Sequence, residues 1–90
     1  MNIDVKEAVR RAVGEIKSLY PESDLTRVML EEVELSHDEM YWIVTIGFDR
    51  PKPSETVFGM LGQTPTERVY KVVKLSTSTG EMVSMKMRGE

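Results

Sequence analysis

Residues 40–48 read MYWIVTIGF, and this stretch decides the fold. Alternate positions form two sets, which are Trp42, Val44, Ile46 and Phe48 on one side and Tyr41, Ile43, Thr45 and Gly47 on the other. A period of two that is filled by β-branched and aromatic residues predicts a β-strand, here over residues 40–49. The single tryptophan and one of the two phenylalanines share a side, so we expect that side to face the centre of the core.

A helix is predicted over residues 4–20. Apolar residues recur there at steps of three and four, and they are Val5, Ala8, Val9, Ala12, Val13, Ile16, Leu19 and Tyr20. This spacing puts them in one stripe along a helix. Asp4 and Glu7 have the spacing of a capping box at the start, and Pro21 ends the helix because a proline disfavours the α conformation in the residue before it. The stripe must be buried, and the strands that follow are its only candidate partner.

Three further strands are predicted, over residues 27–35, 67–76 and 81–88. In the first of these, Glu31 falls on the same side as Met29, Val33 and Leu35, which indicates a bulge or an edge position. In the last, Val83, Met85 and Met87 alternate inward. Residues 50–66 contain three prolines and two glycines and follow no period, which indicates a long loop.

The predicted fold class is therefore α+β. We expect a single domain over residues 1–90, in which one N-terminal helix packs on a four-stranded antiparallel meander with strand order 1-2-3-4.

Composition excludes several classes of protein. The chain has 90 residues, a formal net charge of −3 and no cysteine, so disulfides, thiolate nucleophiles and zinc–sulfur sites are excluded. The net acidity argues against a nucleic-acid partner. There is no apolar run of membrane-spanning length and no signal-peptide pattern at the N-terminus, so we expect a soluble, cytoplasmic protein that does not contact a membrane.

The order of the elements resembles the PepSY-type domain, which is related in shape to the cystatin-like architecture. The resemblance rests on the helix, on the aromatic strand Tyr41-Trp42-Ile43-Val44, and on the turn Thr79-Gly80-Glu81 followed by Met82 and Val83. It implies a helix wrapped by an antiparallel sheet and a binding function, because some PepSY-like domains act as inhibitory or chaperoning pro-segments of peptidases.

This sequence departs from that pattern in three places. PepSY-like domains are mostly extracytoplasmic, whereas this chain shows no export signal. The loop over residues 50–66 replaces a tight turn between the second and third strands. The first hairpin, Ser36 to Met40, does not match the Gln-Val-x-Ala-Gly wedge of cystatins, so cysteine-protease inhibition is not supported.

We expect no catalytic centre, no cofactor and no metal site. The one candidate is His37, the only histidine, which is followed by Asp38 and Glu39. A histidine beside a carboxylate can act as a general base or contribute to a small-ligand site. The same residues are typical of a solvated turn, which is the preferred interpretation.

The outer side of the predicted sheet is the leading candidate for a binding surface. It would carry Tyr41, Ile43, Tyr70 and Val72 in the middle, Glu32 and Glu34 at one edge, and Lys86 and Arg88 at the other. An apolar group on an open sheet face indicates either a protein interface or cross-strand support of the sheet. Opposite charges at the two edges also make the face self-complementary, so a homodimer is a second expectation.

The loop supplies a further candidate. Phe58 precedes Gly59, and Met60 and Leu61 lie between Gly59 and Gly62. They are interpreted either as a cap on the open end of the core or as a recognition tip for a protein partner.

Overall fold

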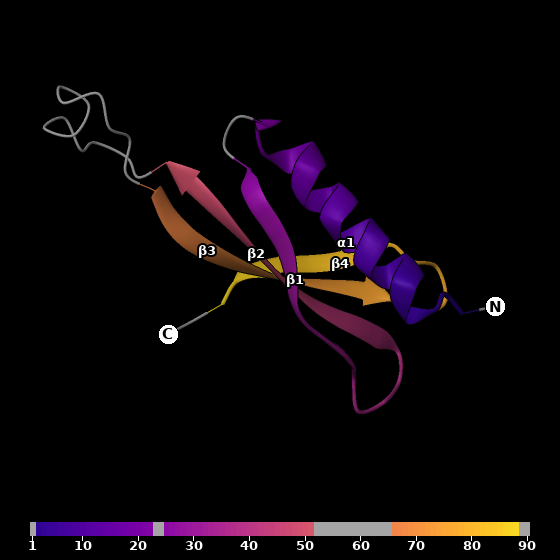
Figure 1. Ribbon diagram of the computed structural model, residues 1–90. Coiled ribbons are helices and arrows are strands. Elements are labelled where there is room, and N and C mark those ends of the chain that lie inside the picture. Colours follow the sequence, from indigo (N-terminus) through magenta and orange to yellow (C-terminus); the bar gives the residue numbers. More distant parts are fainter. Residues whose placement is uncertain (1, 23–24, 52–65, 89–90) are drawn as a thin grey trace, which may run out of the picture.

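β2 lies inside the sheet, and the other elements are arranged around it (Figure 1). The computed structural model describes residues 2–22, 25–51 and 66–88. In these residues the elements are α1 (Val5–Leu19), β1 (Thr26–Leu35), β2 (Tyr41–Pro51), β3 (Thr66–Ser76) and β4 (Met82–Met87). All strand pairs are antiparallel and the order is β1-β2-β3-β4, which confirms the predicted fold class.

The core lies between α1 and one face of the sheet. Its fully buried side chains come from both layers, and they are Ala8, Ala12, Ile16, Val44, Ile46, Phe48, Val73 and Leu75. Val44, Ile46 and Phe48 are alternate residues of β2, as the period of two predicts. Small residues at positions 8 and 12 let the helix approach the sheet closely. The Tyr20 ring closes one end of the core by packing on Phe48, with ring centroids 5.6 Å apart.

Local interactions set the two ends of α1. The Asp4 side chain accepts a hydrogen bond from the Glu7 backbone N–H at 2.8 Å, as an N-cap residue does. The Glu7 carboxylate does not complete a capping box, because it pairs with Arg10 and Arg11 on the next turn. Tyr20 is extended and immediately precedes Pro21. Leu19 was predicted to lie in the buried stripe, but it is 59% exposed because it lies in the last turn.

β1 is an edge strand with two register shifts, between Thr26 and Met29 and between Leu30 and Glu32. The predicted irregularity near Glu31 is confirmed. The second shift leaves Leu30 and Val33 on the α1 side, opposite Ile46 and Val44. Met29 lies opposite Gly47 and is half exposed on the other side of the sheet, so the prediction that it shares a side with Val33 is wrong. The extra residue changes the phase of the alternation.

β4 has a similar irregularity. Lys74 lies opposite Ser84 but Leu75 lies opposite Met82, so Val83 is the extra residue of a bulge. Val83 is 54% exposed, and Met82 packs against the core beside Met85. The prediction that Val83 points inward is therefore wrong.

The N-terminal segment is tied to the turn between β3 and β4. The Ile3 N–H donates to the Thr77 carbonyl at 2.7 Å, and the Trp42 indole N–H donates to the Ile3 carbonyl at 3.2 Å. The buried Thr77 hydroxyl donates to the Met40 carbonyl at 3.0 Å. These bonds hold the start of α1 against one end of the sheet. Within the described residues, no helix has the length and apolar character that crossing a membrane requires.

Candidate functional site

The candidate site is the sheet face opposite α1, which we call the outer face. In the part of the chain that the structure describes, no helix or strand lies over it (Figure 1). The pairing places Tyr41, Ile43 and Thr45 of β2 on this face with Tyr70, Val72 and Lys74 of β3. The four predicted contact residues of these strands, Tyr41, Ile43, Tyr70 and Val72, thus lie on one surface.

The apolar centre of the outer face is small. Val72 lies opposite the buried Thr45, and Ile43 lies opposite Lys74, so Ile43 and Val72 are diagonal neighbours. Both are half-buried. Tyr41 and Tyr70 lie further along, opposite Ser76 and Gly47. The four predicted contact residues therefore form a row with aliphatic side chains in the middle and a tyrosine at each end.

Each of these tyrosines is covered by a cation. The Lys74 ammonium lies 4.4 Å from the centroid of the Tyr41 ring, and the Arg88 guanidinium lies 4.3 Å from that of Tyr70. Such contacts contribute roughly 0.5–1 kcal/mol at exposed sites. They also mean that a partner meets cations stacked on aromatic rings at both ends of the row, and not bare rings.

A charged cluster occupies the end of the outer face nearest the start of β1. The Arg68 guanidinium binds Glu31 at 2.9 Å, Asp49 at 3.1 Å and the Arg27 carbonyl at 2.8 Å. Arg27 in turn pairs with Asp49 at 3.3 Å. The hydrogen bond that Arg68 donates to Glu31, and then the one that it donates to Asp49, raise the pKa of Arg68 above its usual value. This cluster was not predicted.

Gly47 makes room for the cluster. A Cβ at this position would lie 2.7 Å from a carboxylate oxygen of Glu31 and 2.9 Å from Arg68 Nη2. The bulge in β1 turns Glu31 onto the outer face, whereas simple alternation predicted that Glu31 points with Val33 and Leu35. The out-of-phase glutamate and the glycine in an otherwise β-branched strand were the only sequence signals of this arrangement.

The two edges of the outer face carry opposite charges, as predicted. Glu32 and Glu34 of β1 lie opposite Thr45 and Ile43, so their side chains emerge on this face. Lys86 of β4 lies opposite Val72, and the Arg88 N–H donates to the Tyr70 carbonyl at 3.0 Å. The face is thus acidic along β1, apolar in the middle and basic along β4.

The turn at His37 is organised by Asp38. The carboxylate of Asp38 accepts hydrogen bonds from the Ser36 hydroxyl at 2.6 Å and from the Met40 N–H at 3.0 Å. Both bonds lower the pKa of Asp38, and the bond from Ser36 has the larger effect. His37 is exposed and Glu39 has a positive φ of 62°, as residues of a tight turn do. The carboxylate of Asp38 thus closes the β1–β2 hairpin.

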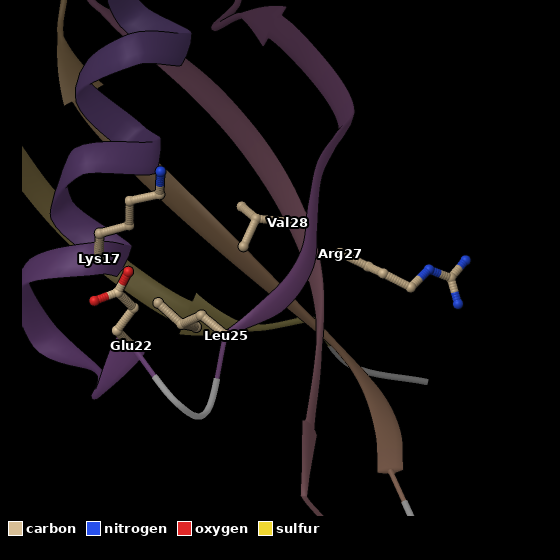
Figure 2. Close-up of a pocket in the computed structure, with 5 residues that line it drawn as sticks. All are labelled: Lys17, Glu22, Leu25, Arg27 and Val28. Atoms are coloured by element: carbon tan, nitrogen blue, oxygen red, sulfur yellow. The ribbon is translucent and has the colours of Figure 1, made fainter.

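A hollow of about 450 Å³ lies between the end of α1 and the start of β1 (Figure 2). It is lined by Lys17, Glu22, Leu25 and Val28, with Arg27 beside it. Figure 2 shows the Arg27 side chain directed away from the other four. Its positive φ of 54° occurs at the first irregularity of β1 and accompanies this turn toward Asp49. Arg27 thus belongs to the charged cluster of the outer face.

Two of the remaining predictions concern metal binding and the contact residues of the loop. No three His, Asp or Glu side chains of the described residues lie close enough to hold a metal ion. Phe58, Met60 and Leu61, the predicted contact residues of the loop, lie outside the described residues.

No protein-family model, curated protein or solved structure matches this chain.

Proposed function

We propose that this protein is a non-catalytic binding module whose outer face contacts a protein, in the first instance a second copy of itself. The observation that carries the proposal is that this face combines an apolar centre with acidic and basic edges and is left open by the described elements. We also propose that the domain is PepSY-like and that the protein is cytoplasmic. Phe58, Met60 and Leu61 of the loop would contribute to binding.

Apolar contact would supply most of the binding energy. Ile43 and Val72 are half-buried in the free protein, so their remaining exposed surface is available to a partner. Burying apolar surface contributes about 25 cal/mol per Å². Tyrosine is enriched at interface hot spots, and Tyr41 and Tyr70 flank the aliphatic centre. The charges at the edges would set the orientation of the partner more than its affinity.

The charge pattern specifies how two copies would meet. A two-fold axis that lies between the two outer faces and runs parallel to the strands places β1 of one copy opposite β4 of the other. Glu32 then lies level with Lys86 of the other copy at both edges of the interface, with Glu34 and Arg88 two residues further along the strands in opposite directions. A two-fold axis perpendicular to the strands would instead place like charges together, which disfavours it.

Light scattering coupled to size-exclusion chromatography tests the proposal. We expect the average mass of the wild type to rise with concentration, and a folded Tyr70→Glu/Val72→Lys variant to show a clearly lower average mass at the same concentration, because the outer-face contact is lost. A Ser18→Lys/Leu19→Glu variant is the matched control, because it adds the same two charges at exposed positions of α1. A monomeric wild type, or an average mass that is the same in the wild type and in the outer-face variant, would contradict self-association through this face.

A further inference from the structure

We propose that the two free edges of the sheet recognise each other, so that β1 of one copy pairs with β4 of a neighbouring copy and the sheet continues from molecule to molecule. This interface uses the strand edges and is separate from the outer-face contact described above. Among the described residues, no strand lies beyond β1 or beyond β4. An open strand edge presents unpaired N–H and C=O groups that another strand can use.

The regular parts of the two edges have equal length. Between Glu32 and Leu35, β1 follows an unbroken register with β2, and its bulges lie nearer the start of the strand. Between Ser84 and Met87, β4 follows an unbroken register with β3, and its bulge lies at Val83. Bulges protect a strand edge against pairing. Each edge therefore has one unprotected stretch of four residues.

One register matches these stretches in charge and in polarity. When Glu34 lies opposite Lys86 of the neighbouring copy, Glu32 lies opposite the neighbour's Arg88. These four side chains all lie on the outer-face side. On the α1 side, the same register places Leu35 opposite Met85 and Val33 opposite Met87 of the neighbouring copy. Opposite-charge and apolar cross-strand pairs both stabilise antiparallel sheets.

The backbone groups agree with this register. In an antiparallel strand, successive residues direct their N–H and C=O groups to alternate sides. The Ser36 N–H donates to the Tyr41 carbonyl at 2.8 Å. Every second residue before it, Glu34 and then Glu32, therefore also directs its backbone N–H and C=O groups toward β2. Leu35 and Val33 are left to direct their groups toward the free edge.

The same reasoning applies to β4. The Arg88 N–H donates to the Tyr70 carbonyl, so the backbone N–H and C=O groups of Lys86 and Ser84 also point toward β3. Met87 and Met85 therefore direct their groups outward. The register that pairs the charges thus also brings together the residues with free backbone groups, which is the arrangement that a hydrogen-bonded antiparallel pair needs.

The neighbouring strand would find space beside β1. A groove of about 300 Å³ between α1 and β1 is lined by Val5, Lys6, Val9, Leu30 and Val33. Met87, which is 52% exposed, would enter this apolar groove from the neighbouring copy, and Leu35, which is 39% exposed, would be covered by the neighbour's Met85. Four strands at a spacing of about 4.8 Å separate successive copies by about 19 Å, which exceeds the diameter of a helix of about 10–12 Å.

Charge excludes the two symmetric alternatives. Pairing β1 with β1 would place glutamates of the two copies together, and pairing β4 with β4 would gather Lys86 and Arg88. Like charges directly opposite each other destabilise a sheet. The interface is therefore head-to-tail, and it forms a ring if the rotation between copies closes and an open ribbon if it does not.

Disulfide trapping with two single-cysteine variants tests the pairing, because the natural chain contains no cysteine. A Leu35→Cys variant with ¹⁵N labelling is mixed with an unlabelled Met85→Cys variant and oxidised gently at about 50 mM salt, where charge pairs are weakly screened. We expect the mixed 35–85 disulfide to exceed each symmetric disulfide by about tenfold or more, because only the head-to-tail register places opposite charges together. Mass spectrometry of the labelled and unlabelled halves gives the ratio.

Two further mixtures complete the test. A Ser84→Cys variant in place of Met85→Cys is the matched control, because residue 84 lies on the opposite side of the sheet and should give the statistical mixture of products. The pair Val33→Cys and Met87→Cys is the second register-matched pair, should either first variant fail to fold. Statistical products from the register-matched pairs would overturn the proposal.

One further experiment distinguishes a failure of the edge pairing from a failure of the outer-face contact. Adding Tyr70→Glu/Val72→Lys to both cysteine variants should leave the 35–85 disulfide unchanged, since neither residue lies at a free edge. Loss of the disulfide in that background would overturn edge pairing as an independent interface.

Discussion

Replacing Gly47 by alanine perturbs the charged cluster of the outer face at one point. The new methyl group would meet Glu31 at 2.7 Å and Arg68 at 2.9 Å, so these side chains must move, and we expect the Glu31–Arg68 bond of 2.9 Å to lengthen. Both side chains are partly exposed, so the loss of this pair costs about 0.2–1 kcal/mol. Alanine in a strand gains roughly 0.5–1 kcal/mol over glycine, because it has less conformational entropy to lose on folding.

The two effects nearly cancel in the wild type, so a double-mutant cycle is needed to separate them. In a Glu31→Ala background the methyl group has no carboxylate to displace, and Gly47→Ala should then stabilise the protein by about 0.5–1 kcal/mol. The gain from alanine is the same in both backgrounds, so the expected coupling between positions 31 and 47 equals the lost ion pair, about 0.2–1 kcal/mol. Urea unfolding of the four proteins, followed by tryptophan fluorescence, measures it.

The sign of the coupling decides the outcome. We expect Gly47→Ala to be more favourable without Glu31 than with it. A matched cycle between Gly14→Ala and Glu31→Ala should show no coupling, because a Cβ at Gly14 meets no atom within 4 Å. Equal effects of Gly47→Ala in both backgrounds would refute the interpretation that this glycine exists to accommodate the ion pair.

Three further predictions concern separate parts of the molecule. Gly14→Ala should by itself raise the free energy of unfolding by about 1 kcal/mol, because a helical glycine next to open space is replaced by the best helix former; thermal unfolding would show the rise, and no rise would contradict it. Ile46→Val should lower that free energy by about 0.5–1.5 kcal/mol, because it removes one methylene from a fully buried site; urea unfolding measures the loss, and a neutral result would contradict the packing described here. The pKa of Asp38 should lie below its ordinary value and rise toward it in Ser36→Ala, so the stabilisation from this turn is present above the ordinary pKa and is lost as pH falls through the lowered one; an NMR titration of the carboxyl carbon measures both values, and an unshifted wild-type pKa would contradict the Ser36–Asp38 bond.

The fold class was predictable because its signals are local. The alternation from Trp42 to Phe48 determines which side of β2 is buried, and the same rule applies to β3, where Val73 and Leu75 are buried. The stripe of α1 is predictable in the same way, because its period follows from helix geometry. In each case neighbouring residues in the chain carry all the information that the prediction needs.

The strand positions that were predicted wrongly share one cause. Met29, Glu31 and Val83 all lie at register shifts, where one extra residue reverses the alternation that follows. The pattern in β1 indicated an irregularity at Glu31 but not which neighbour would change sides. That choice depends on Arg68, which is 37 residues away in the chain and offers Glu31 a charged partner on the outer face.

The site was predictable in its composition but not in its contacts. Alternation placed Tyr41, Ile43, Tyr70 and Val72 on one face, yet the cations that cover the two tyrosines come from neighbouring strands. The Arg88–Tyr70 contact depends on the pairing of β3 with β4, which a hydrophobic pattern in either strand does not specify. Pairwise contacts between strands therefore required the structure.

The central claim is that the outer face is the surface on which this protein binds. The most direct measurement is the concentration dependence of backbone amide chemical shifts in two-dimensional ¹H–¹⁵N NMR spectra of the wild type. We predict that the shifts change with concentration at outer-face residues of the two inner strands, Ile43 and Val72 above all, and stay constant at Gly14 and Ser18 of α1, which lie at neither proposed interface. Shifts that are constant at Ile43 and Val72 over the whole concentration range, or that change at Gly14 and Ser18 instead, would contradict the claim.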